Sequence, residues 1–178
     1  MIDMETLADT TQVGRLVDDL AERIRAEMAE SPRWALVGIL RRGDVLAQRL
    51  AAKLKPDHIG SVDIALYRDD LSELGPQPVV RTTNIDFDLD GTDVVLVDDV
   101  LMTGRSVRAA IQSLIDYGRP RRIKLAVLVD RGGRELPIAA DFVGRTIEAG
   151  PDTLVSVELK PTDKHDRITL MPRPTATD

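Results

Sequence analysis

The chain has 178 residues, of which 43% are hydrophobic and 30% charged, and its formal net charge is −6. This length predicts a single domain over 1–178, and the balance excludes a disordered chain. The absence of cysteine excludes a disulfide framework and a thiolate metal site. The negative charge argues against broad, non-specific nucleic-acid binding. No apolar run approaches the length of a bilayer span, so we expect a cytoplasmic protein with no membrane partner.

The first third of the chain predicts two helices and two strands. In two segments apolar residues recur at three- and four-residue spacing, which is typical of an amphipathic helix. Two other runs are apolar and of strand length, as in a sheet covered on both faces. The predicted elements are a helix capped by Thr10 or Thr11 and ended by Ser31-Pro32, a strand over 34–40, a helix from about Asp44 to Leu54, and a strand over 62–67.

A polar segment separates this part from a second set of elements. Residues 68–93 contain Pro and Gly but little periodicity, which predicts a long flexible loop or hairpin arm of the kind that is usually functional or disordered. The next unit alternates strand, helix and strand; such units have parallel strands and bind ligands at the carboxyl ends of those strands. The predicted strands are 94–97 and 123–129 around a helix over 106–117, with three added edge strands within 141–147, 154–159 and 167–171.

The segment VVLVDDVLMTGRS, residues 94–106, carries the clearest chemical signal. Asp98 and Asp99 follow an apolar run, and a Thr-Gly-Arg-Ser turn leads from them into a helix. Backbone N–H groups at a helix start can converge on a phosphate. The carboxylates can accept hydrogen bonds from sugar hydroxyls or hold Mg²⁺ through water. The loop lacks the Lys of a Walker A motif and the spaced glycines of a dinucleotide fingerprint, so neither of those nucleotide sites is predicted.

This acidic pair, followed by apolar residues and Thr-Gly, resembles the signature of type I phosphoribosyltransferases, which bind 5-phosphoribosyl 1-diphosphate (PRPP). Within that superfamily, LYRDDL at 66–71, DYGRP at 116–120 and LAVLVDRGGRELPIAADFVG at 125–144 are similar to the bifunctional pyrimidine operon regulators and uracil phosphoribosyltransferases. The resemblance runs in order from about Val13 to Leu159. It implies an α/β fold with a central, mostly parallel sheet flanked by helices, a long mobile loop and a small strand-rich hood over the base.

The same resemblance implies the reaction. Uracil and PRPP would give UMP and diphosphate with Mg²⁺ as cofactor, and a pyrimidine-sensing regulatory role would accompany catalysis. Loss of diphosphate develops positive character on the sugar and negative charge on the leaving group, which explains the need for carboxylates, arginines and a divalent cation. No covalent nucleophile is needed. The family commonly forms dimers or tetramers, so a homo-oligomer is expected.

The resemblance assigns roles to individual residues. Asp98 and Asp99 would hold the ribose hydroxyls, and Arg81 would close over the substrate from the mobile loop; these three are the expected catalytic residues. The loop GILRRG, 38–43, would bind the diphosphate, and 103–106 the 5′-phosphate. The full set expected to bind PRPP is Arg41, Arg42, Asp98, Asp99, Val100, Leu101, Met102, Thr103, Gly104, Arg105 and Ser106.

The base would be recognised at the end of the following strand. The resemblance places Asp130 and Arg131 at the start of the base-recognition loop, and Val157 near the edge of the pocket. Met102 stands where a Tyr is common in the signature, so packing against the base or sugar is expected to differ.

Some members of the family also bind a stem-loop of pyrimidine operon messenger RNA. At the corresponding face this chain keeps Arg15, Arg134 and Arg145. Other positions on that face have lost a hydrogen-bonding or basic group, and one carries an acid that repels phosphate, so RNA attenuation is not expected. Those positions are Gly14, Asp18, Gly133 and Ala139.

Two other functions remain open at the level of sequence. One is a UMP-responsive, RNA-binding regulator with weak catalysis, against which the diminished basic face argues. The other is a purine-salvage phosphoribosyltransferase, because the phosphate sites are shared across the superfamily and only the base loop differs. The segment VDRGGREL, 129–136, favours the pyrimidine family.

Overall fold

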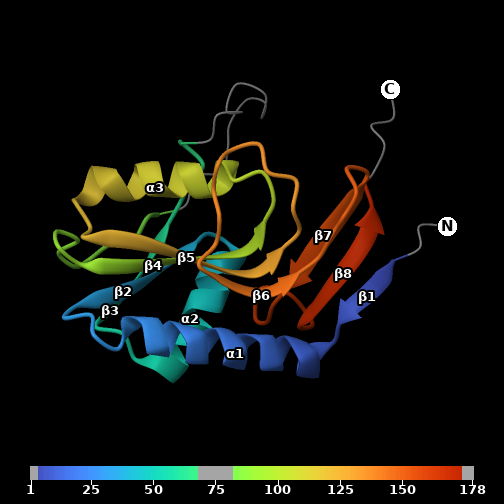
Figure 1. The fold of residues 1–178 in the computed structure, drawn as a ribbon, viewed down its shortest axis with the longest axis horizontal. Helices are drawn as coiled ribbons and strands as arrows, with labels where there is room; N and C mark the ends of the chain where they lie inside the picture. Colours follow the sequence, from blue (N-terminus) through green and yellow to red (C-terminus); the bar gives the residue numbers. More distant parts are fainter. Residues whose placement is uncertain (1–3, 68–81, 174–178) are drawn as a thin grey trace.

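The computed structural model describes residues 4–67 and 82–173. A five-stranded parallel sheet, in the order β3-β2-β4-β5-β6, lies between α3 on one face and α1 and α2 on the other. A three-stranded antiparallel sheet, β1-β8-β7, lies beyond the carboxyl ends of the parallel strands (Figure 1). The elements are β1 (Glu5–Ala8), α1 (Thr10–Met28), β2 (Trp34–Ile39), α2 (Arg42–Leu54), β3 (His58–Val62), β4 (Asp93–Leu101), α3 (Arg105–Tyr117), β5 (Arg122–Asp130), β6 (Phe142–Thr146), β7 (Thr153–Glu158) and β8 (Arg167–Pro172).

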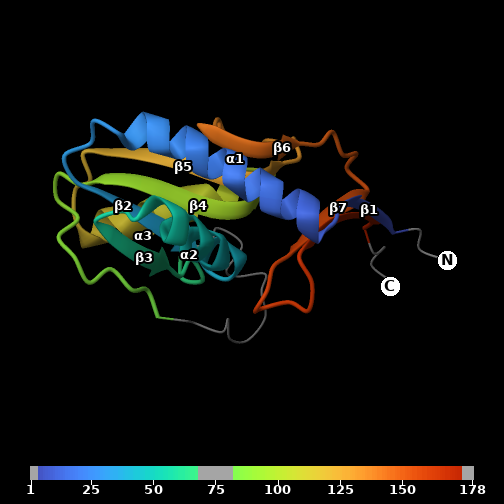
Figure 2. The ribbon, with the colours of Figure 1, turned by 90° about the horizontal axis from the view of Figure 1, so that it is seen from below.

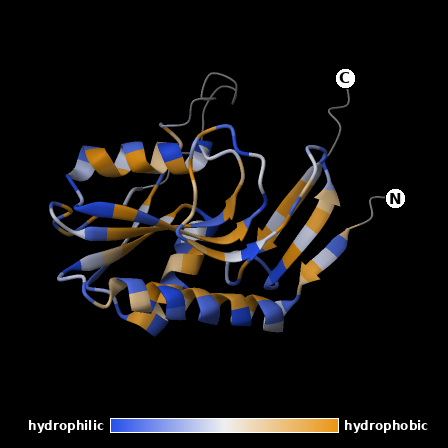
Figure 3. Cartoon of the chain, viewed as in Figure 1, coloured by the Kyte–Doolittle hydropathy of each residue, from blue (hydrophilic) through white to orange (hydrophobic). Residues whose placement is uncertain are grey.

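The parallel sheet is apolar because helices cover both of its faces. In β4, Val95 and Val97 belong to the core shared with α1 and α2, whereas Val94 and Leu96 belong to the core shared with α3. All four are fully buried. Figure 3 shows the contrast with the antiparallel sheet, whose strands β7 and β8 alternate hydrophobic and hydrophilic residues. This alternation is expected of a sheet with one face on the core.

The first helix begins on a capping box rather than on a threonine. The backbone N–H of Gln12 donates to Asp9 Oδ1 at 2.9 Å, and the Asp9 N–H donates to Gln12 Oε1 at 2.9 Å. The predicted cap at Thr10 or Thr11 is therefore wrong, because both threonines already lie inside the helix. From this start α1 runs along β5 and β6, and its first turn reaches the antiparallel sheet (Figure 2).

The strand that follows α2 lies earlier than predicted. It is formed by HIGSV, 58–62, which pairs with β2 from Ala35 to Ile39. The predicted strand over 62–67 is wrong: Ala65 N–H donates to the Asp63 side chain, and the backbone turns there. Within β3, a Cβ atom at Gly60 would lie 2.7 Å from the carbonyl oxygen of Asn84, so only glycine permits this close approach.

The end of the predicted long loop is tied to the sheet. Residues 68–81 of that loop lie outside the described residues. Beyond them, Asn84 and Ser61 exchange two backbone hydrogen bonds, of 2.8 and 3.0 Å, and Leu89 is buried. None of the helices in the described ranges is long and apolar enough to cross a membrane.

The antiparallel sheet joins the two ends of the described chain. The runs predicted within 154–159 and 167–171 form β7 and β8, and β1 adds to β8, with Glu5 opposite Leu170. The four-residue β1 was missed because it is too short to show a period of its own. The third run forms β6 at the edge of the parallel sheet. The predicted fold class is confirmed.

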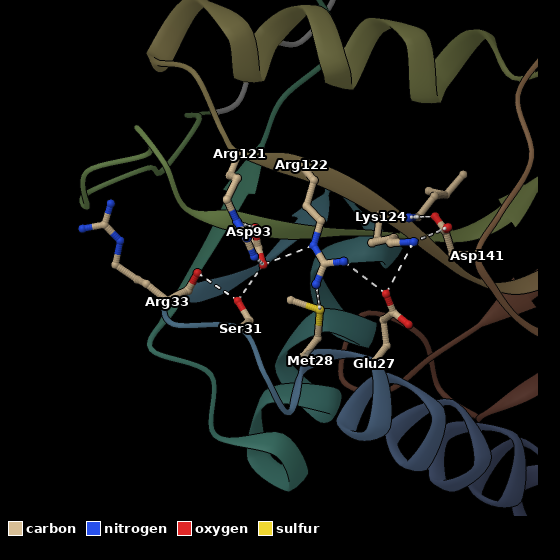
Figure 4. Close-up of polar contacts among 10 residues, drawn as sticks. Glu27, Met28, Ser31, Arg33, Asp93, Arg121, Arg122, Lys124 and Asp141 are labelled. Carbon is tan, nitrogen blue, oxygen red and sulfur yellow. Dashed lines mark hydrogen bonds and ion pairs between the residues drawn. The ribbon is translucent and has the colours of Figure 1, made fainter.

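A buried carboxylate joins three segments at the amino-terminal end of the parallel sheet (Figure 4). Asp93, whose side chain has no exposed surface, accepts hydrogen bonds from Arg121 Nε at 2.7 Å, Arg122 Nε at 3.1 Å and Ser31 Oγ at 2.7 Å. The hydrogen bond from Arg121, aided by the other two donors, lowers the pKa of Asp93 to about 2. The ionised carboxylate therefore stabilises the start of β4 against the start of β5 and the α1–β2 turn.

We expect Asp93→Asn to lower the free energy of unfolding by about 1–3 kcal/mol at pH 7, because two arginines and a serine lose their ionised partner. The folded-state pKa lies below the unfolded one, so this contribution is present above pH 4 and is lost as the pH falls toward 2. Urea denaturation across this range should show the wild-type advantage shrinking. Glu27→Gln, which removes an exposed partner of Arg122 and Lys124, serves as control and should cost less than about 0.5 kcal/mol. An equal loss in both variants would contradict the role of Asp93.

Candidate functional site

The candidate site lies at the carboxyl end of β4, where its two neighbouring strands end at different points. Pairing with β2 ends at Gly38 opposite Val97, whereas pairing with β5 continues to Leu101 opposite Asp130. The acidic pair therefore lies within the last part of β4, not after the strand as predicted. One edge of this segment pairs with β5, and the other has no strand partner beyond Val97 and faces the start of α2.

Asp98 and Asp99 differ in exposure: Asp98 is buried and Asp99 is half-buried. Asp98 is 8% exposed, and its Oδ1 accepts a hydrogen bond from the Asp99 N–H at 2.9 Å. Asp99 in turn accepts the N–H of Val100 at 2.9 Å. Burial raises the pKa of both carboxyls, and the neighbouring Asp99 raises that of Asp98 further. Such a pair favours a ligand that brings hydroxyl donors or a cation.

The loop between β2 and α2 brings two arginines near the acidic pair. Arg41 is exposed, and Arg42 opens α2. The Arg42 guanidinium donates to both carboxylate oxygens of Asp163. At the start of α2, Gly43 faces the acidic strand, since a Cβ atom there would lie 2.5 Å from the Val97 carbonyl oxygen and 3.3 Å from Asp98 Oδ1.

The turn that follows β4 has the geometry of an anion cradle. Gly104 precedes α3 with φ 90°, a conformation that favours glycine. The Thr103 hydroxyl oxygen accepts the Arg105 N–H at 3.2 Å, and the first N–H groups of α3, including that of Ser106, lie at the positive end of the helix. The Arg105 side chain pairs with Glu135 at 2.7 Å. This turn can therefore bind phosphate through backbone N–H groups.

The residues expected to recognise the base fall into two environments. Asp130 ends β5 and accepts Arg134 Nη2 at 2.5 Å and the Gly132 N–H at 3.0 Å. Arg131 is 2% exposed and donates to the carbonyl oxygens of residues 149, 150 and 153. Its guanidinium thus supports the start of β7 and the segment before it, and its backbone N–H donates to the Leu101 carbonyl oxygen at 3.0 Å, which leaves the Arg131 carbonyl oxygen as its group for contact with the base. Val157 is buried in the core below.

Met102 and Gly133, two residues that differ from the family pattern, lie next to each other. A Cβ atom at Gly133 would lie 3.5 Å from Cγ of Met102, and Gly133 has φ 80°. Of the other signature residues, Leu101 is buried in the core shared with α3, and Val100 packs on the opposite core. In the base loop, the Met102 side chain therefore lies against the backbone of Gly133.

The basic residues of the expected RNA face are largely engaged within the protein. Arg134 donates to the carbonyl oxygens of Ile138 at 2.7 Å and Met102 at 2.9 Å, besides its pair with Asp130. Arg145 donates to the carbonyl oxygen of Leu7. Arg15 is exposed on α1. Arg81 lies outside the described residues, so its predicted role stays a prediction.

Sequence reasoning missed two residues that shape the site. Asp163, the partner of Arg42, was part of a polar turn with no signal beyond its charge. Gly43 was only the last letter of a loop motif, and its close packing on Asp98 depends on how α2 meets β4. The described residues contain no cluster of three potential metal ligands. A divalent cation at the acidic pair would therefore need oxygens from the substrate and from water.

Residues 3–161 match the family described as phosphoribosyl transferase domain. Curated relatives extend the match: the bifunctional protein PyrR of Elusimicrobium minutum is 46% identical over 170 residues, 93% of this chain and 95% of the relative. That of Thermus thermophilus is 52% identical over 160 residues, 85% of this chain and 88% of the relative. The chain belongs to the phosphoribosyl transferase family and, within it, to the family of bifunctional PyrR proteins. The predicted family is thus confirmed.

Solved structures show the same fold at low identity. A hypoxanthine-guanine phosphoribosyltransferase from Bacillus anthracis has a TM-score of 0.72 at 20% identity, covering 96% of this chain and 99% of that one. A hypoxanthine phosphoribosyltransferase from Trypanosoma cruzi has a TM-score of 0.70 at 19% identity, covering 96% and 97%. These similarities establish the type I phosphoribosyltransferase fold and carry no information on the base.

We expect Gly43→Ala to raise the KM for PRPP by about tenfold or more, because the new methyl group forces the start of α2 away from β4 and displaces Asp98. Steady-state kinetics with varied PRPP measures this. Gly14→Ala is the matched control, since a Cβ atom there meets nothing within 4 Å. It should leave the KM unchanged and raise helix stability slightly. An unchanged KM in Gly43→Ala would show that the contact with β4 does not shape the site.

Proposed function

We propose that the chain transfers the phosphoribosyl group of PRPP to uracil, giving UMP and diphosphate, at the carboxyl end of β4. The observation that carries the proposal is the acidic pair of buried Asp98 and half-buried Asp99, which lies beyond the end of the pairing with β2 and next to the anion cradle at 103–106. Membership of the phosphoribosyl transferase and PyrR families supports the reaction class. Uracil as the acceptor follows from the resemblance of the base loop to the pyrimidine family.

In this proposal each segment holds one part of PRPP. The N–H groups at 103–106 bind the 5′-phosphate, and Asp98 and Asp99 accept hydrogen bonds from the ribose hydroxyls. Arg41 and Arg42 bind the diphosphate and stabilise its charge as the bond to the sugar breaks. The fixed carboxylates also lie close to a ring that becomes partly cationic, which lowers the barrier further.

The site fits a Mg²⁺ ion that the protein and the substrate hold together. Two adjacent carboxylates with raised pKa values and a diphosphate together offer the oxygen ligands that Mg²⁺ prefers. When bound, the ion supplies Lewis-acid stabilisation of the leaving diphosphate. Asp98 and Asp99 are the residues that would hold it.

The proposal extends to the partners of the chain. Catalysis is favoured over RNA binding as the function carried by this chain's own residues, because Arg134 and Arg145 donate to internal carbonyls and Asp18 pairs with Lys53 at 2.6 Å. A homo-oligomer in the cytoplasm is proposed from the family resemblance.

A panel of bases tests the acceptor. With PRPP and Mg²⁺, we expect turnover with uracil and at least about a hundredfold lower kcat/KM with hypoxanthine or guanine, because a site built to pair with one base leaves buried polar groups unpaired with another. Product nucleotides are measured by chromatography. Turnover with the purines alone would overturn the choice of uracil and leave phosphoribosyl transfer intact.

Asp98→Asn separates catalysis from stability. Burial and Asp99 raise the pKa of Asp98, so its charged form is disfavoured in the folded state at neutral pH. The variant should lose about a hundredfold or more in kcat/KM while its melting temperature stays the same or rises by a few degrees. The asparagine oxygen can still accept the Asp99 N–H. A large fall in melting temperature would instead show that Asp98 stabilises the fold.

A further inference from the structure

The loop between β7 and β8, residues 159–166, is fastened to α2 beside the candidate site. Arg42 Nε donates to Asp163 Oδ2 at 3.0 Å, and Nη2 donates to Oδ1 at 3.0 Å. This is the bidentate fork that arginine forms with a carboxylate, which fixes direction as well as distance. The Asp163 side chain is 15% exposed and that of Arg42 is 34% exposed. The pair is thus partly shielded from water, while the arginine remains accessible.

Asp163 is itself held rigidly by its own loop. Its Oδ2 accepts the N–H of Leu159 at 2.8 Å, and its backbone N–H donates to the Leu159 carbonyl oxygen at 2.9 Å. The hydrogen bond from Arg42 lowers the pKa of Asp163, so the carboxylate is ionised at neutral pH. Arg42 is therefore bound to a charge that has little freedom to move.

The hydrogen bonds to Asp163 leave some N–H donors of the Arg42 guanidinium available for a ligand. Arginine has five N–H donors, and the hydrogen bonds to Asp163 use the one on Nε and one on Nη2. The two donors on Nη1 and the second on Nη2 form the outer edge. The next residue of α2, Gly43, lies against the acidic pair, since a Cβ atom there would lie 3.3 Å from Asp98 Oδ1, so the start of α2 that carries Arg42 adjoins the acidic pair as well as the loop.

We propose that Asp163 is a positioning residue for recognition of the diphosphate of PRPP: it holds Arg42 in the orientation in which the outer edge of the guanidinium meets the ligand. This inference rests on the proposed function, in which Arg42 binds the diphosphate. A long, flexible side chain loses rotamer freedom when it grips an anion, and the loss is smaller when the fold already fixes it. The loop 159–166 thereby contributes to substrate affinity without touching the substrate.

The same loop carries a matched control. Asp166 accepts Arg49 Nη1 at 2.8 Å and Nη2 at 2.7 Å, and the Lys160 N–H at 2.8 Å. This second fork has the same chemistry and fastens the same loop to the same helix. Arg49, however, lies two turns further along α2 than Arg42. Asp166→Asn therefore loosens the loop without releasing Arg42.

The experiment compares Asp163→Asn with Asp166→Asn in the full chain. Steady-state kinetics gives kcat and the KM values for PRPP and uracil, and calorimetry gives the Kd for inorganic diphosphate with Mg²⁺. The melting temperature reports how much stability each variant loses. We expect Asp163→Asn to raise the PRPP KM and the diphosphate Kd by about tenfold, with the uracil KM within about twofold of wild type. Asp166→Asn should change the PRPP KM and the diphosphate Kd by less than about twofold, although it lowers the melting temperature by a similar amount to Asp163→Asn. Asp163→Glu, which keeps the charge, should recover part of the affinity.

Arg42→Gln, alone and combined with Asp163→Asn, separates this inference from the proposed function. Loss of diphosphate affinity in Arg42→Gln, with no further loss in the double variant, is the result expected if Asp163 acts through Arg42. Equal effects of the two loop variants, or tighter diphosphate binding by Asp163→Asn, would overturn the positioning role. Wild-type affinity in Arg42→Gln would remove the assignment of Arg42, and this inference with it. Weak binding by Arg42→Gln beside normal binding by Asp163→Asn would overturn the inference alone.

Discussion

The site depends on the uneven pairing of β4. Its hydrogen bonds to β2 end at Val97, while those to β5 continue to Leu101. The strand therefore holds Asp98 and Asp99 in an extended, fixed backbone and still leaves one edge open. A pair of carboxylates attached to a free loop would separate to reduce their repulsion. Held on β4, they stay side by side, with Asp98 buried and both pKa values raised, and a hydroxyl donor or a cation would stabilise their charged forms.

Around this strand, arginine forks connect parts of the chain that are distant in sequence. Arg42 and Arg49 bind the β7–β8 loop to α2, while Arg131 binds the segment before β7 through its carbonyl oxygens. Charge-assisted, bidentate contacts of this kind fix orientation better than apolar packing does. The antiparallel sheet is thereby held against the parallel sheet at the side where the substrate is proposed to bind.

The opposite end of the parallel sheet uses the same chemistry for stability. Asp93 begins β4 with a buried carboxylate satisfied by Arg121, Arg122 and Ser31. Its pKa is lowered to about 2, whereas the pKa of Asp98 is raised, although both residues lie on one strand. The difference lies in the surroundings: Asp93 accepts hydrogen bonds from cations, whereas Asp98 is buried without a cationic partner and lies beside another carboxylate. The charge of Asp93 stabilises one end of β4, whereas the charge of Asp98 at the other end is disfavoured until a ligand supplies a hydroxyl donor or a cation.

Much of the fold followed from local pattern. The apolar runs of β2, β4 and β5 and the helical spacing of α1, α2 and α3 predicted these elements to within a few residues, because burial on both faces requires apolar residues throughout. β3 was placed too late, because its position depends on pairing with β2 rather than on its own hydrophobicity. β1 was missed, since four residues form a strand only when β8 is present to pair with them.

By itself, the sequence determined the family, the βαβ unit and the acidic pair before a phosphate loop, because these are encoded in contiguous residues with fixed spacing. Tertiary structure alone decided which charges meet. Arg42 and Asp163 are 121 residues apart, and no local pattern distinguishes an arginine that grips an aspartate from one that faces water. It also decided that Arg131 and Arg134 donate to backbone carbonyls within the protein. Hydrogen bonding depends on distance and direction in space, which spacing along the chain does not specify.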